Sequence, residues 1–202
     1  MISINLWHFY NELLMKRIRH KTLKTKARKL DKELSKINTS RFPRKKVQEL
    51  AKKIFPDCEF EGGGWHKDVF YITSRNKKRD LVIKIAQKRK IKGEVKIYKM
   101  VGKDFAKIYW NTKYVALQEF GDHKSEVPKE EIKRLKGIGL KFRLNDVRKG
   151  NIAKFGNRFK IIDADTEKML EEDVEYFKKT NDNHKREVIK RGLTKLREKI
   201  GK

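Results

Sequence analysis

One lysine inside an apolar run limits most strongly how this chain can fold. The run Leu81–Ile85 has the β-branched composition of a buried strand, and Lys84 is its one polar member. An ammonium group is rarely buried without a partner, so a fold that buries this run must place an acid beside Lys84. Glu94 is the candidate, because Ile97 and Val101 follow it on one face of a predicted helix. The alternatives are an edge-strand lysine that faces water and a solvated Glu94.

A glycine-rich segment precedes the lysine run. Phe60–Ile72 has the pattern of two strands joined by a loop that contains Gly62, Gly63 and Gly64. Glycine permits positive φ and lets backbone N–H groups approach a phosphate, because it has no Cβ. A plain hairpin turn would use the same residues. Further on, Lys113–Gly121 has the pattern of another strand that runs into a short linker.

Two polar motifs follow in the C-terminal half. Asp146 stands five residues before Asn151, and the apolar run Phe159–Ile162 ends in Asp163. Phosphoryl transfer requires mainly that charged and metal-binding groups be held in position. One loop could present a carboxylate and then a neutral oxygen ligand, while the strand end supplies a second carboxylate. Each motif taken alone is also common in ordinary turns.

The order of these segments resembles that of the protein-kinase-like superfamily, over roughly residues 57–170. The resemblance implies an α+β, bilobal fold with a small antiparallel-sheet N-lobe, a reduced helical C-lobe and an N-terminal helical extension. The corresponding domains are residues 1–55 for the basic extension, 56–121 for the N-lobe and hinge, and 122–202 for the reduced C-lobe.

The resemblance also implies roles for single residues. Asp146 would accept the proton of the acceptor hydroxyl, Lys84 would hold the phosphates, and Arg148 would balance charge on the transferred group. Asn151 and Asp163 would bind Mg²⁺. The residues expected to contact ATP are Gly62, Gly63, Gly64, Lys84, Glu94, Glu119 and Gly121. Glu94 would orient Lys84, and Glu119 and Gly121 would use main-chain groups of the hinge, with Gln118 at the rear of the pocket.

The chain also departs from the common kinase pattern. Leu144-Asn145-Asp146 stands in place of His-Arg-Asp, and Asp163-Ala164-Asp165 stands in place of Asp-Phe-Gly. Asp165 could be a second metal ligand, or a carboxylate that caps a helix or is solvated after the strand. Lys67 occupies the position of the third glycine of the phosphate-covering loop. These departures resemble the minimal atypical kinases: the RIO type, the KEOPS-complex kinase, the lipopolysaccharide-core sugar kinases and the aminoglycoside phosphotransferases.

The predicted function is an atypical kinase that uses ATP and Mg²⁺ to phosphorylate a hydroxyl on a protein or a small molecule. The alternative is a non-catalytic kinase-like module that binds RNA or a ribonucleoprotein. A net charge of +27 on 202 residues favours a polyanionic partner in both cases. No apolar run reaches the ~20 residues of a membrane span and no signal-peptide core is visible, so a cytoplasmic protein is expected.

The N-terminal 53 residues carry 16 Lys and Arg against 4 Asp and Glu, a net +12. Apolar residues recur there at helical spacing: Leu6, Phe9, Tyr10 and Leu13, then Leu23, Ala27, Leu30, Leu34 and Ile37, and finally Val47, Leu50, Ala51 and Ile54. Two interpretations follow from this pattern. The helices either form a basic arm that recruits RNA, or pack their apolar stripes on the N-lobe and leave a solvated basic face.

Overall fold

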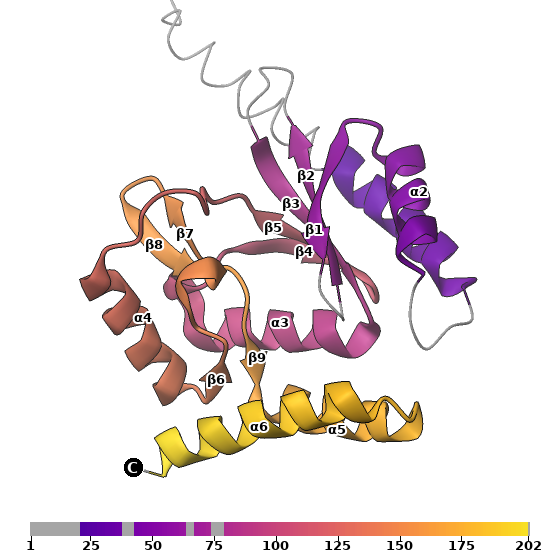
Figure 1. The fold of residues 1–202 in the computed structure, drawn as a ribbon. Coiled ribbons are helices and arrows are strands. Elements are labelled where there is room, and N and C mark those ends of the chain that lie inside the picture. Colours follow the sequence, from indigo (N-terminus) through magenta and orange to yellow (C-terminus); the bar gives the residue numbers. More distant parts are fainter. Residues whose placement is uncertain (1–20, 38–42, 64–66, 74–78, 202) are drawn as a thin grey trace, which may run out of the picture.

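A five-stranded antiparallel sheet forms the centre of the computed structural model, which describes residues 21–37, 43–63, 67–73 and 79–201 (Figure 1). The strands run in the order β1-β2-β3-β5-β4, with bounds β1 Cys58–Gly63, β2 Lys67–Thr73, β3 Arg79–Ala86, β4 Ile108–Asn111 and β5 Val115–Glu119. The predicted α+β class with an antiparallel sheet is therefore confirmed. Because β3 lies between β2 and β5, Lys84 does not belong to an edge strand.

The glycine segment lies partly within the sheet. Gly62 and Gly63 are the last residues of β1, opposite Val69 and Asp68, whereas Gly64 lies outside the described residues. The sequence pattern predicts a loop that contains Gly62 and Gly63, and this prediction is wrong, because both residues belong to β1. A Cβ on Gly63 would lie 2.3 Å from Oδ1 of Asp68, so this position has no room for a side chain.

Two helices cover one face of the sheet (Figure 1). They are the helix at residues 21–35 and α2, Arg44–Ile54. Their stripe residues Leu23, Ala27, Leu30, Leu34, Val47, Ala51 and Ile54 are buried against Phe70, Ile72, Leu81, Ile83, Ile85, Val115 and Leu117. Each large apolar side chain buried in this way contributes about 1.5–3 kcal/mol. The described part of the extension therefore packs on the sheet, while the stripe Leu6, Phe9, Tyr10 and Leu13 lies outside the described residues.

The helix that carries Glu94 belongs to a second core. This helix, α3, spans Lys88–Val101 and is followed by the short 3₁₀ helix η1, Gly102–Asp104. The sequence pattern predicts a helix that begins at Glu94, but α3 begins at Lys88, so Glu94 lies in the second turn. Ile91, Ile97 and Val101 of α3 are buried with residues from the C-terminal half.

Short strands and helices make up the rest of the chain. They are α4 Lys129–Lys141, β6 Leu144–Asn145, η2 Lys149–Asn151, β7 Ile152–Phe155, β8 Arg158–Ile161, β9 Asp165–Thr166, α5 Glu167–Lys179 and α6 Asn183–Ile200. Strand β6 pairs with β9, and β7 pairs with β8. Helices α5 and α6 share a third apolar cluster around Phe177 and Leu193. None of the described helices is long and apolar enough to cross a membrane.

Candidate active site

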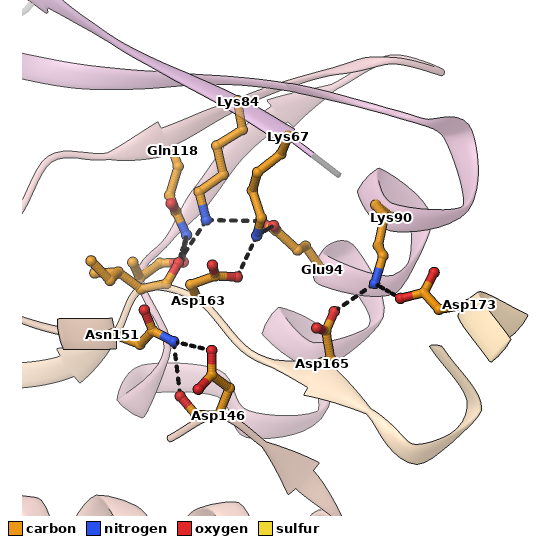
Figure 2. Close-up of polar contacts among 12 residues, drawn as sticks. Lys67, Lys84, Lys90, Glu94, Gln118, Asp146, Asn151, Asp163, Asp165 and Asp173 are labelled. Carbon is orange, nitrogen blue, oxygen red and sulfur yellow. Dashed lines mark hydrogen bonds and ion pairs between the residues drawn. The ribbon is translucent and has the colours of Figure 1, made fainter. Parts of the chain in front are cut away.

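The pair of Lys84 and Glu94 lies between the sheet and α3 (Figure 2). Nζ of Lys84 donates to Oε2 of Glu94 at 2.9 Å and to the carbonyl oxygen of Ile162 at 2.6 Å. Both side chains are almost fully buried, at 5% and 2% exposure. The buried strand lysine therefore has the acidic partner that its sequence context required, and the solvated alternative for Glu94 is wrong.

A second lysine reaches the same carboxylate. Nζ of Lys67 donates to Oε1 of Glu94 at 2.5 Å and also to Asp163, and its side chain is 16% exposed (Figure 2). In the β2–β3 register Lys67 lies opposite Ala86 and Val69 lies opposite Lys84, so the two lysines are diagonal neighbours on one sheet face. From the sequence alone, Lys67 is identified only as the residue at the position of the third glycine of the phosphate-covering loop.

Asp163 follows β8 and lies within reach of both lysines (Figure 2). Burial alone would raise the pKa of this carboxyl group, but the ammonium groups of Lys67 and Lys84 outweigh burial and lower it to about 2. Burial would likewise lower the pKa of Lys67, and the carboxylates of Asp163 and Glu94 raise it instead. Asp163 is thus an ionised carboxylate with a cation already beside it.

Asp146 and Asn151 form a compact loop between β6 and β7. The side-chain nitrogen Nδ2 of Asn151 donates to the backbone oxygen of Asp146 at 2.9 Å and to Oδ2 of Asp146 at 2.8 Å (Figure 2). Asp146 has φ of 66°, a left-handed conformation that is uncommon outside glycine. Because the amide nitrogen of Asn151 makes both bonds, its amide oxygen is the atom suited to a metal.

Asp146 has a distinct electrostatic setting. Burial raises the pKa of its carboxyl group, Arg148 and Asn151 oppose that rise, and the negative charge of Asp163 adds to it. Arg148 Nε lies 2.9 Å from Oδ1 of Asp146, and its own side chain is 70% exposed. Arg148 therefore stands beside the candidate base, at the solvent edge of the site.

Backbone bonds hold the two polar motifs together. The N–H of Ile162, next to Asp163, donates to the carbonyl oxygen of Asn151 at 2.9 Å. Asn145, next to Asp146, pairs with Asp165 in the β6–β9 ladder. The structure thus brings Lys84, Glu94, Asp146, Asn151 and Asp163 into one site, although they come from distant parts of the sequence.

Asp165 forms a salt bridge with a lysine of α3. Its carboxylate accepts from Nζ of Lys90 at 3.0 Å, and the same Nζ donates to Asp173 at 2.5 Å (Figure 2). The cap of α5 is the side chain of Thr166, which accepts from the N–H of Met169. The capping interpretation of Asp165 is therefore wrong, and its carboxylate forms a salt bridge that connects α3 to the C-terminal segment. Its role as a second metal ligand stays a prediction.

The donor set fits a hard cation only in part. Among the described residues, no group of three or more His, Cys, Asp and Glu side chains could hold a metal by itself. A carboxylate and an amide oxygen are ligands that Mg²⁺ accepts, and Mg²⁺ commonly completes its shell with substrate phosphates and water. Asp163 and Asn151 therefore suit a magnesium ion that arrives together with a nucleotide.

The C-terminal end of β5 adjoins the site, and Glu119, predicted to lie in the hinge, is the last residue of this strand. Gln118 is buried, and its amide nitrogen lies 3.4 Å from the carbonyl oxygen of Ile162, to which Lys84 also donates. The N–H of Glu119 donates to the carbonyl oxygen of Lys107 at 2.8 Å, and its carboxylate binds Lys160 at 2.7 Å. A Cβ on Gly121 would lie 2.4 Å from the Phe155 ring, so the linker packs closely on β7 at that point.

Comparisons with known proteins give a partial structural match. No protein-family model and no curated protein matches the sequence. One similar solved structure is the streptomycin–ATP–APH(2")-IIa ternary complex, with 14% identity, a TM-score of 0.29, and coverage of 51% of this chain and 42% of that one. Another is Rad53 in complex with AMP-PNP, with 21% identity, a TM-score of 0.32, and coverage of 60% and 43%. This chain spans less than half the length of either of these two proteins.

Proposed function

We propose that this protein is an ATP- and Mg²⁺-dependent phosphotransferase that acts on a hydroxyl group of a protein or small molecule. The observation that carries the proposal is the convergence of Lys84, Glu94, Asp146, Asn151 and Asp163 through the contacts of one site. A cationic group for phosphate, oxygen ligands for a metal and a carboxylate for a proton are the parts that phosphoryl transfer requires.

Each of these residues has a defined part in the reaction. Lys84, oriented by Glu94, binds the phosphates. Glu119, at the end of β5, and Gly121, just after it, offer main-chain groups to the adenine. Asp163 and Asn151 would hold Mg²⁺, which when bound neutralises charge on the phosphates. Asp146 accepts the proton of the acceptor hydroxyl as its oxygen attacks the γ-phosphorus, and the bond to the β-phosphate oxygen breaks to release ADP. The burial that raises the pKa of Asp146 makes its carboxylate a better proton acceptor. Arg148, paired with Asp146, offers positive charge to the transferred group.

The test is magnesium-dependent turnover of radiolabelled ATP by the whole chain, with a panel of protein and small-molecule acceptors. Asp146→Asn removes the proton acceptor and is expected to reduce transfer by about 10²–10⁴-fold. Asp163→Ala removes the metal carboxylate and is expected to abolish transfer, while circular dichroism remains unchanged. Asp57→Asn is the matched control, because Asp57 is exposed in the turn between α2 and β1.

Two results would contradict this function. The first is turnover by Asp146→Asn and Asp163→Ala at the level of the control. The second is a wild-type chain that binds RNA with a steep salt dependence but neither binds nor turns over ATP, which would favour the non-catalytic RNA-binding module.

A further inference from the structure

The sequence pattern gave Lys67 no function, yet it reaches the centre of the site. Its Nζ contacts Glu94 Oε1 at 2.5 Å and Asp163, and its side chain is 16% exposed (Figure 2). In the described part of the chain, more than a quarter of the residues are Lys or Arg, and most such side chains lie at the surface. An ammonium group brought this close to two carboxylates is not an ordinary solvated lysine.

Lys67 is not needed to orient Lys84. Lys84 uses the other oxygen of Glu94, Oε2 at 2.9 Å, and has a second acceptor in the carbonyl oxygen of Ile162 at 2.6 Å. One carboxylate therefore holds two ammonium groups, each through its own oxygen. Lys67 also donates to Asp163, and this second hydrogen bond is not needed to position Lys84.

Lys67 and a metal ion would compete for the same carboxylate. Asp163 is the charged ligand available for Mg²⁺, and in the structure it is already neutralised by Lys67. When Mg²⁺ takes Asp163, Lys67 loses one partner, and its flexible four-carbon side chain can turn toward a nearby anion. The triphosphate that accompanies the metal is such an anion, and Lys84 lies on the same sheet face.

We propose that Lys67 is an internal counter-ion for Asp163 that yields to the metal and then binds the nucleotide phosphates as a second phosphate-binding lysine beside Lys84. The inference rests on the proposed function, because it concerns the same nucleotide and metal. Lys67 would thus hold the site in a neutral state before the nucleotide arrives and would make metal and nucleotide binding depend on each other.

The test is equilibrium binding of a fluorescent ATP analogue to the whole chain at graded Mg²⁺ concentrations, with no acceptor and no turnover. Lys67→Met is compared with the wild type and with Lys92→Met, an exposed α3 lysine whose loss makes the same change in net charge. Two changes are expected in Lys67→Met alone. Nucleotide affinity at saturating Mg²⁺ falls about tenfold, because one charged phosphate contact is lost. The Mg²⁺ concentration for half-maximal binding also falls by several-fold, because no ammonium competes for Asp163.

Lys67→Arg provides a second variant with the charge retained. It is expected to recover most of the nucleotide affinity at saturating Mg²⁺, which shows that the loss in Lys67→Met does not reflect misfolding. Unchanged affinity in Lys67→Met would show that Lys67 does not bind phosphate, and an unchanged Mg²⁺ requirement would show that it does not compete with the metal. Either result overturns the inference while the wild type still binds nucleotide. A wild type that binds no nucleotide at any Mg²⁺ concentration would contradict the proposed function itself.

Discussion

At the scale of single residues, buried charges account for both the fold and the site. Glu94 is nearly fully buried and accepts from Lys67 and Lys84 through separate oxygens. Such pairs recover their desolvation cost only when the geometry is good, and removal of one partner typically destabilises a protein by about 3–5 kcal/mol. The two lysines and Glu94 therefore hold α3 against the sheet, in addition to any role with a nucleotide.

A second buried carboxylate allows a test by pH. Asp68 lies beside Gly63, its side chain is 10% exposed, and its Oδ1 forms an ion pair with Nε of Arg44 at 3.1 Å. Burial raises the pKa of Asp68, and Arg44 opposes that rise. A carboxyl group whose pKa is raised in the folded state binds its proton more tightly there, so stability falls as pH rises from its unfolded value of about 3.9 through the folded value.

Arg44→Gln is therefore expected to destabilise the protein in a pH-dependent way. The free energy of unfolding should fall by about 1 kcal/mol at pH 7, where Asp68 is ionised. The effect is this small because the Arg44 side chain is half exposed and solvent weakens its ion pair. It should shrink toward pH 4, where Asp68 takes up a proton. Urea unfolding at both pH values measures the difference. The control is Lys45→Gln, a change of equal charge at the next exposed position. A loss of equal size at both pH values would show that Asp68 is not the group that Arg44 stabilises.

At the scale of helices and strands, two glycines of α4 give a matched pair of substitutions. Gly137 has open space around it, whereas a Cβ on Gly139 would lie 2.8 Å from Cγ2 of Val147, the residue after Asp146. Gly137→Ala is expected to stabilise the protein by up to about 1 kcal/mol, because alanine favours the helix. Gly139→Ala should instead destabilise it by about 1–3 kcal/mol, because Val147 is β-branched and moves with difficulty.

Gly139→Ala should also lower phosphate transfer, since displacement of Val147 shifts the loop that holds Asp146 and Asn151. Thermal unfolding and ATP turnover, measured on both alanine variants, separate the two effects. Equal melting temperatures for the two variants would mean that α4 does not press on this loop as the structure indicates.

Much at this scale could be predicted from the sequence, because periodicity and spacing are local signals. The lysine run, the buried stripe of the helix at residues 21–35, and the loop of Asp146 and Asn151 all occur where their patterns indicated. The role of Lys67 could not be predicted in this way. Its position beside Lys84 depends on the register of β2 against β3, and a shift of one residue would turn Lys67 to the opposite face. The register is fixed by tertiary packing and the hairpin, which the sequence pattern does not specify.

The N-cap of α5 and the close approach of Gly63 to Asp68 also could not be predicted from the sequence. Thr166 and Asp165 are adjacent, and both residue types can cap a helix. In the structure Thr166 caps α5, whereas Asp165 forms a salt bridge with Lys90. Gly63 is required by Asp68 on the neighbouring strand, a contact that no local pattern shows.

At the scale of the whole molecule, the net charge of +27 is unevenly distributed along the chain. Residues 1–53 account for +12 of it, and the described helices of that segment bury their apolar stripes on the sheet. Packing of the stripes leaves lysines such as Lys21, Lys29 and Lys32 exposed to solvent. The two interpretations of the extension are therefore compatible, since a helix can pack on the sheet and present a basic face on its other side.

This charge predicts binding of single-stranded RNA that is governed by salt. The logarithm of the binding constant for a uridine oligonucleotide should fall linearly with the logarithm of the salt concentration, with a slope of about −0.7 for each phosphate neutralised. A variant with Lys21, Lys29 and Lys32 all changed to Gln should reduce that slope by about 2, because three contacts are lost. The matched control changes the exposed lysines Lys168, Lys195 and Lys199 of α5 and α6. If the basic extension is the RNA-binding face, the control keeps the wild-type slope, and an equal reduction in both variants would mean that RNA senses only the net charge of the protein. If the basic extension is the RNA-binding face, Asp146→Asn should also keep the wild-type slope, because the candidate active site is not part of that face.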